Sequence, residues 1–165
     1  MHRYEAVSTE GEVAETPPID SVCFTDARQV VARAQVDTCI GWMTWPEVWH
    51  LDGEGRFCCY FKGSSLDSLR GWADDPSPLR RSRLEGLRGG GCADHWVVVD
   101  SRPSWRYPAM RVGEPDVEAL IQVRQALEPL GVGLLDVVIF DDRQHWWSLH
   151  ELSSGTTRWE FGGRS

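Results

Sequence analysis

This sequence has no long apolar run and no excess of positive charge. None of its apolar stretches approaches the roughly 20 residues that a membrane-spanning helix needs, so no membrane partner is expected. Asp and Glu number 25 against 17 Lys and Arg, which gives a formal net charge of -8. A chain with this balance lacks the basic field that holds nucleic acid or an anionic membrane surface. The sequence therefore favours proteins or small molecules as partners.

Cysteine is too irregular in number and spacing for a disulfide framework. The chain has five cysteines, an odd number, and no apolar signal segment follows Met1. Both features predict a cytoplasmic protein with reduced thiols. Its 165 residues are a usual length for one domain.

Tryptophan, in contrast, is abundant, with nine residues. Nine indoles are more than a core of this size easily buries. Two interpretations stay open: some tryptophans line a groove or an interface, or they are partly buried packing residues.

Composition divides the chain into three parts. Residues 1–20 are predicted to be a disordered acidic leader, because "STEGEVAETPP" has few apolar residues, several carboxylates and a proline pair. Residues 21–152 are predicted to fold as one domain. Residues 153–165 are predicted to be a weakly ordered C-terminal tail.

Within the domain the apolar patterns alternate between helix and strand. A short helix is expected after Thr25, a hairpin around the glycine-rich turn at 52–55, and a helix from Ser77-Pro78 that ends before three glycines. "HWVVVDS" is typical of a buried strand, and residues 114–130 form the clearest amphipathic helix. A second hairpin is expected to pair "LLDVVIF" with "HWWSLHEL". This order predicts an α/β protein of the α+β type, a mixed sheet with two to three helices packed on it.

Three motifs in the second half of the chain resemble a known family. The strand of "VVVDSRPSW" leads into a polar corner, "GEPD" begins a helix, and "LLDVVIFDDRQHWWSLHEL" closes the pattern. In this order and spacing, residues 97–151 resemble the RadC-like branch of the JAB/MPN (JAMM) metalloproteases. The resemblance extends more weakly upstream to about residue 22, and it implies a JAB/MPN-like domain.

The resemblance also implies a metal site that this sequence has lost. Family members hold zinc with two histidines and an aspartate, and here those positions are Asp100, Arg102 and Asp116. Arginine has no lone pair to give a metal, and catalytic zinc needs about three protein ligands. The family's serine before the aspartate is Gly113, and its catalytic glutamate falls at Thr44, with Glu47 the nearest carboxylate. The sequence therefore predicts no metal at this site.

A guanidinium is the natural replacement for that metal. If Asp100 and Asp116 converge as the resemblance implies, their charges need a cation between them. Arg102 suits this role because its planar fork binds carboxylates. We expect an Asp–Arg–Asp salt bridge; the alternative is that Arg102 points into solvent from a loop.

A relocated zinc site is a weaker hypothesis. His50 lies nearly opposite Cys58 and Cys59 on the first hairpin, while Cys92 and His95 precede the central strand. Their spacing matches no known zinc pattern, and packing is the usual role of such residues.

Two classes of function follow. The first is a metal-free JAB/MPN-fold pseudoenzyme that acts as a binding or scaffold module for a protein or small molecule, through the former active-site groove. The groove candidates are Thr44, Trp45, Glu47, Ser104, Trp105 and Gly113. The second is an enzyme: a divergent isopeptidase or peptidase using Asp100, Asp116 and His95, or a metal-independent enzyme using Asp100, Arg102 and Asp116.

Overall fold

The computed structural model describes residues 6–7, 13–14, 18–37, 46–74, 94–103, 112–143 and 145–161. Its α-helices are α1 (Ala27–Asp37), α2 (Leu66–Ala73), α4 (Glu114–Leu127) and α5 (Leu149–Ser154). The main sheet contains β3 (Glu47–Leu51), β4 (Phe57–Lys62), β5 (His95–Ser101), β6 (Gly133–Phe140) and β7 (Trp146–Ser148). The remaining elements are 3-10 helices η1 (Ile19–Ser21) and η3 (Glu128–Leu130), and a ladder of β1 (Ala6–Val7) with β2 (Val13–Ala14).

The main sheet is mixed, with the strand order β4-β3-β5-β6-β7. β5 and β6 are parallel, and the other neighbouring pairs are antiparallel. A parallel pair needs a crossover connection, and α4 provides it between β5 and β6. The predicted α+β domain with helices on a mixed sheet is confirmed.

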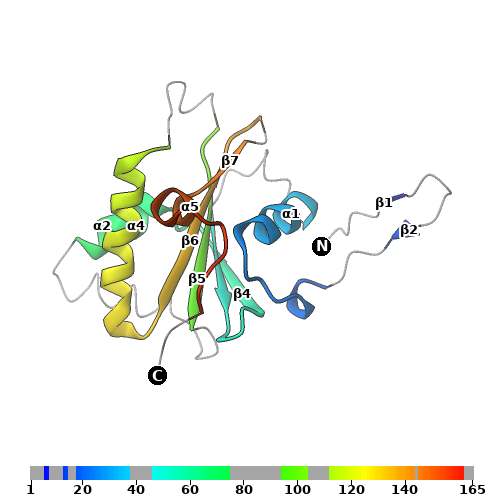
Figure 1. Cartoon of the computed structure of the whole chain (residues 1–165), viewed down its shortest axis with the longest axis horizontal. Helices are drawn as coiled ribbons and strands as arrows, with labels where there is room; N and C mark the ends of the chain where they lie inside the picture. Colours follow the sequence, from blue (N-terminus) through cyan, green and yellow to red (C-terminus); the bar gives the residue numbers. More distant parts are fainter. Residues whose placement is uncertain are drawn as a thin grey trace.

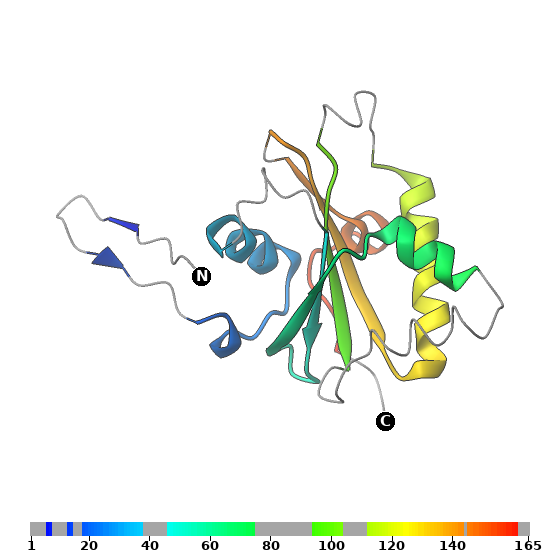
Figure 2. The same cartoon turned by 180° about the vertical axis from the view of Figure 1, so that it is seen from behind.

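Helices cover both faces of the sheet (Figure 1). α2 and α4 pack on one face, and α1 lies on the other, as the reverse view also shows (Figure 2). Alternate residues of β5 enter the two cores, with Trp96 and Val98 facing α2 and α4, and Val97 and Val99 facing α1. This double burial explains the continuous apolar run of that strand.

The clearest helix and both central strands agree with the sequence predictions. α4 begins after Gly113 and ends at Leu127, where η3 continues to Leu130, and Gly131 adopts a positive φ of 75°. The first hairpin pairs β3 with β4 as expected. α2, however, was not predicted as a separate helix; Ser65 caps it by accepting the Ser68 N–H. The helix predicted from Ser77 lies outside the described residues.

The second hairpin is shorter than predicted. Its last strand ends at Ser148 and the chain then forms α5, because the Ser148 hydroxyl accepts the Glu151 N–H at 3.1 Å and caps a helix. The expectation of strand through Leu152 was wrong.

The segment after residue 152 is also more ordered than predicted. Residues 153–154 belong to α5, and Trp159 is buried with 4% of its surface exposed. Its backbone N–H donates to Thr25 O at 2.9 Å, and the backbones of Asp26 and Arg158 form an isolated antiparallel β-bridge. The prediction of a weak tail is therefore corrected for residues 153–161. In the predicted leader, the described residues form the β1–β2 ladder and η1, and the others lie outside the described part.

In the part of the chain that the structure describes, no helix combines the length and the apolar character needed to cross a membrane.

Candidate functional site

Arg102 and Asp116, two of the three residues that the family resemblance assigns to metal-ligand positions, meet where β5 ends and α4 begins. β5 is prolonged by one further bond, from Arg102 N–H to Phe140 O at 2.7 Å. Asp100 is paired with Ile139 in the parallel ladder, and Ile139 belongs to the core under α2 and α4. Because side chains alternate along a strand, Asp100 and Arg102 lie on that helical side of the sheet.

Arg102 and Asp116 form a direct ion pair. Arg102 Nη2 lies 2.6 Å from Asp116 Oδ1, and the two side chains are only 10% and 14% exposed. Asp116 is in the first turn of α4, and its Oδ2 accepts the Gly113 N–H at 3.1 Å. Burial opposes the charged guanidinium, but the neighbouring carboxylates, Asp116 above all, raise the pKa of Arg102 overall. The alternative of a solvated Arg102 does not hold in this structure.

Asp100 is close to this pair but is held differently. Its side chain is buried, and its Oδ1 accepts the Ser101 N–H at 2.8 Å. A second backbone donor is Leu66 N–H at the start of α2. Burial raises the pKa of Asp100, while Arg102 opposes that rise. Among the described residues, the ion pair of Arg102 is with Asp116 and not with Asp100. The predicted Asp–Arg–Asp bridge is thus formed on one side.

Glu47 does not join these residues. It is paired with Val99, which faces α1, so its side chain lies on the opposite side of the sheet from Asp100. Burial raises the pKa of Glu47, and its cross-strand neighbour Lys62 opposes the rise. Gly113 lies beside the pair as the residue that caps α4. The other groove candidates, Thr44, Trp45, Ser104 and Trp105, lie outside the described residues.

The hypothesis of a relocated zinc site finds no ligand cluster in the described ranges. His50 is opposite Cys59 in the hairpin, as predicted. Its ring, however, stacks on Trp96 at 5.1 Å and meets Phe61 edge-on at 4.7 Å. Burial lowers the pKa of His50 to about 4. Across the described residues no three His, Cys, Asp or Glu side chains are grouped to hold a metal ion, and Cys92 lies outside them.

Sequence reasoning missed a buried polar centre at Asp136. This carboxylate has no exposed surface, and it accepts from the Ser148 hydroxyl at 2.5 Å, the His150 N–H at 2.9 Å and the Trp159 indole N–H at 3.0 Å. Three donors separated in sequence thus converge on one side chain. The arrangement ties α5 and the C-terminal segment to β6.

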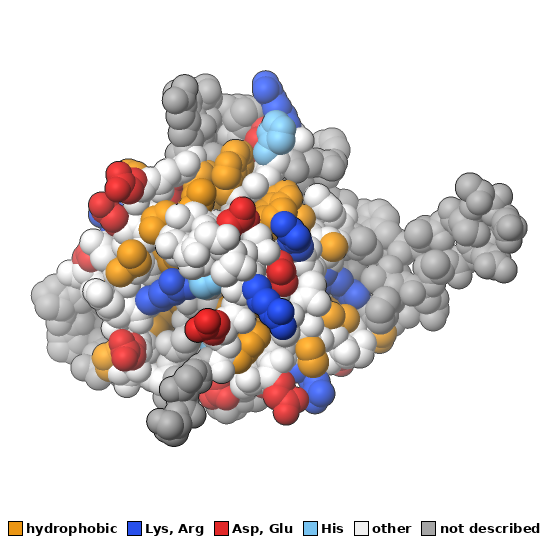
Figure 3. All heavy atoms as spheres, in the orientation of Figure 1, with side chains coloured by type: hydrophobic (Ala, Val, Ile, Leu, Met, Phe, Trp, Pro, Cys, Tyr) orange, Lys and Arg blue, Asp and Glu red, His pale blue; other side chains and the backbone are white. Residues whose placement is uncertain are grey.

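A cavity of about 570 Å³ lies beside this centre, between α4, β6, α5 and the C-terminal segment. Figure 3 shows basic, histidine and carboxylate side chains gathered on this face of the molecule. Its wall includes Arg124, which lies within the apolar pattern of the predicted helix. A cation among the apolar residues of α4 was the one sequence signal that could have marked it.

The fold and these sites define an α+β protein of one domain, with a polar corner at the end of β5 and a cavity beside β6. No known family model matches the chain, and no curated protein resembles it closely enough to count as a match.

Proposed function

We propose that this protein is a metal-free JAB/MPN-like binding or scaffold module, in which Arg102 stands where the family holds its metal. The observation that carries the proposal is the 2.6 Å ion pair between Arg102 and Asp116, with Asp100 buried nearby. All three occupy positions that the family resemblance assigns to metal ligands.

The order of elements supports the family part of the proposal. The resemblance implies a helix, a hairpin, a strand ending in the ligand motif, a helix starting with the ligand aspartate, and two closing strands. The chain follows this order through α1, β3 and β4, β5, α4, β6 and β7. The motif residues, 14 positions apart in sequence, come within bonding distance. This convergence is what the family geometry requires.

The donor set argues against zinc hydrolysis. Arg102 presents a cation where a ligand would be needed, and zinc would have to displace it from Asp116. Asp100 is already engaged by two backbone N–H groups. Glu47, the candidate base, lies across the sheet. These residues do not fit a catalytic zinc ion. What they supply is a largely buried ion pair that ties the end of β5 to the start of α4.

A metal-independent enzyme is the second candidate, and one observation favours it. Burial raises the pKa of Asp100, and a carboxyl group that keeps its proton can serve as a general acid. Against it, Asp100 has only 5% of its surface exposed.

The experiment is metal analysis of wild type and of an Asp100→His/Arg102→His double variant, purified without a histidine tag. We expect no stoichiometric zinc and no zinc-induced rise in melting temperature for wild type. The double variant restores two imidazoles beside Asp116, so it should bind zinc and lose it when Asp116→Ala is added. Stoichiometric zinc in wild type that Asp116→Ala removes would overturn the metal-free proposal. A folded double variant without zinc would overturn the family geometry.

A further inference from the structure

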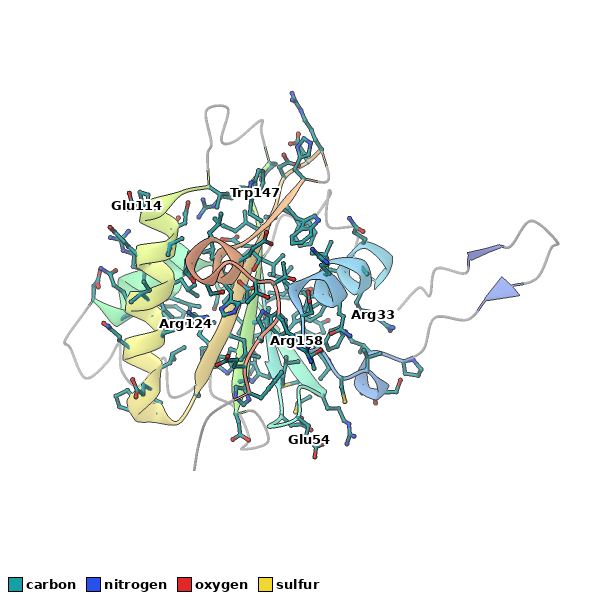
Figure 4. The ribbon with its side chains drawn as sticks, in the orientation of Figure 1. Arg33, Glu54, Glu114, Arg124, Trp147 and Arg158 are labelled. Carbon is teal, nitrogen blue, oxygen red and sulfur yellow. The ribbon has the colours of Figure 1, made fainter. Side chains whose placement is uncertain are left out.

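The cavity beside β6 has the composition of a small-molecule site. Its volume of about 570 Å³ lies in the range of ligand pockets. Apolar groups from Val132, Leu134, Leu135 and Trp159 form part of the wall, and two arginines reach it from different elements. Arg124 comes from α4 and Arg158 from the C-terminal segment, and both are labelled in Figure 4.

Arg124 is a partly buried cation that has no direct counter-ion among the described residues. Its Nε donates to Leu134 O at 2.7 Å and its Nη2 to Leu135 O at 2.6 Å, which fixes the guanidinium against β6. Burial lowers the pKa of Arg124, and the more distant Asp136 offsets this only in part. Among the described residues, no carboxylate forms an ion pair with it. A bound anion would supply the missing charge.

His150 completes this wall of the cavity. Its Nδ1 lies 3.3 Å from Arg124 Nη2, which can only donate, so Nδ1 accepts. Its Nε2 then carries the proton and donates to Arg158 O at 3.0 Å. The imidazole thereby links the arginine of α4 to the backbone of the C-terminal segment.

Arg158 provides a second cation at the mouth of the cavity. Arg158 is exposed, and its guanidinium forms no ion pair within the described ranges. Glu128 and Glu160 also line the cavity, but neither is paired with Arg124 or Arg158. These two carboxylates limit the charge that the cavity accepts, so a ligand with one anionic group fits better than a polyanion.

We propose that this cavity binds a small organic molecule that carries one oxyanion group, a carboxylate or a phosphate ester, on an apolar body. Arg124 and Arg158 hold the oxyanion, and the apolar wall with Trp159 covers the body. The site is separate from the corner of Arg102: Arg124 and Asp116 are eight residues apart on α4, or about 12 Å along its axis. The inference is therefore independent of the proposed function.

The test measures binding of benzoate and phenyl phosphate to the full-length protein by ¹H–¹⁵N spectra, with benzyl alcohol as the uncharged comparison. We expect shifts of the Arg124 side-chain N–H and of backbone amides in 154–160 with either anion, and none with benzyl alcohol. Arg158→Gln should weaken anion binding by about tenfold, the loss of one charge-assisted contact. Arg158 is exposed and its side chain forms no ion pair in the described structure, so the variant should fold.

Arg143→Gln is the matched control, because Arg143 is an exposed arginine in the turn between β6 and β7. It should bind the anions as wild type does. Equal weakening by both variants would reduce the effect to net charge and overturn the proposal. So would benzyl alcohol binding as tightly as benzoate, or no shift with either anion at millimolar concentration. A preference for one of the two anions supports the site and identifies the oxyanion.

Discussion

At the scale of single residues, we expect the loss of Arg102 to reduce the free energy of unfolding markedly. Arg102→Met keeps much of the apolar stem but leaves Asp116 without its partner, at 14% side-chain exposure, and Asp100 without its nearest cation. Removing one member of a largely buried pair leaves an uncompensated charge, so we expect a loss of about 3 kcal/mol in the free energy of unfolding. Urea unfolding followed by far-UV circular dichroism measures it.

Arg56→Met is the matched control for that substitution. Arg56 lies 4.0 Å from Glu54, and these side chains are 54% and 80% exposed. Such surface pairs contribute little, so the control should change the free energy of unfolding by about 0.5 kcal/mol or less. If Arg102→Met caused no larger loss than this, the ion pair would have no structural role.

The ion pair between Arg102 and Asp116 could be predicted from the sequence, but the hydrogen-bond partners of Asp100 could not. The first pair follows from motif positions and from the charge balance that two converging carboxylates need. Asp100 instead accepts the Leu66 N–H, and Leu66 belongs to a helix that was not predicted. A contact between segments 34 positions apart depends on tertiary packing that local patterns do not encode.

At the scale of elements, the β3–β4 turn should be sensitive to one glycine. Gly55 has a φ of 89°, which favours glycine. A Cβ there would lie 2.3 Å from Phe24 O and 2.8 Å from Phe161 Cζ. The backbone carbonyl cannot easily move away, so Gly55→Ala should destabilise the protein by more than the roughly 1 kcal/mol of a left-handed alanine. Thermal unfolding measures the difference.

Gly63 separates the two causes. Its φ is 98°, but nothing lies within 4 Å of its added Cβ. Gly63→Ala therefore carries the backbone strain alone, and the excess loss of Gly55→Ala reports the contacts with Phe24 and Phe161. Equal losses in the two variants would mean that neither Phe24 nor Phe161 packs closely against this turn.

Elements with a long, uniform pattern were predicted well, and those set by one capping residue were not. α4 carries an apolar stripe over four turns, and β5 is buried on both faces, so each has many residues that agree. β7 ends because one hydroxyl, that of Ser148, caps the next helix. The C-terminal segment is ordered by Trp159, whose partner Asp136 lies 23 positions earlier. A single residue of this kind carries too little local signal to override the apparent strand or tail.

At the scale of the whole molecule, the burial of carboxylates shapes how stability depends on pH. Burial raises the pKa of Glu47, Asp100 and Asp136 in the folded protein, despite opposing neighbours such as Lys62, Arg102 and the Ser148 hydroxyl. The folded state then binds these protons more tightly than the unfolded chain does. Stability from this source is present at low pH and is lost as pH rises through the folded values. The formal net charge of -8 adds repulsion in the same direction.

His50 sets the acid limit of that trend. Its pKa is lowered from 6.5 to about 4, so between these values the unfolded chain binds the proton more tightly. Stability from this histidine is therefore lost as pH falls through that window. We expect the free energy of unfolding to decline as the pH rises through the raised pKa values of these carboxylates, and to decline also as the pH falls from 6.5 toward about 4, where His50 acts. Guanidinium chloride unfolding at a series of pH values measures it. Asp100→Asn cannot ionise and should flatten the alkaline decline, whereas Asp20→Asn, at an exposed position on η1, should leave it unchanged. A wild-type stability that rose steadily toward pH 8 would show that these carboxylates ionise in the folded state as easily as in the unfolded chain.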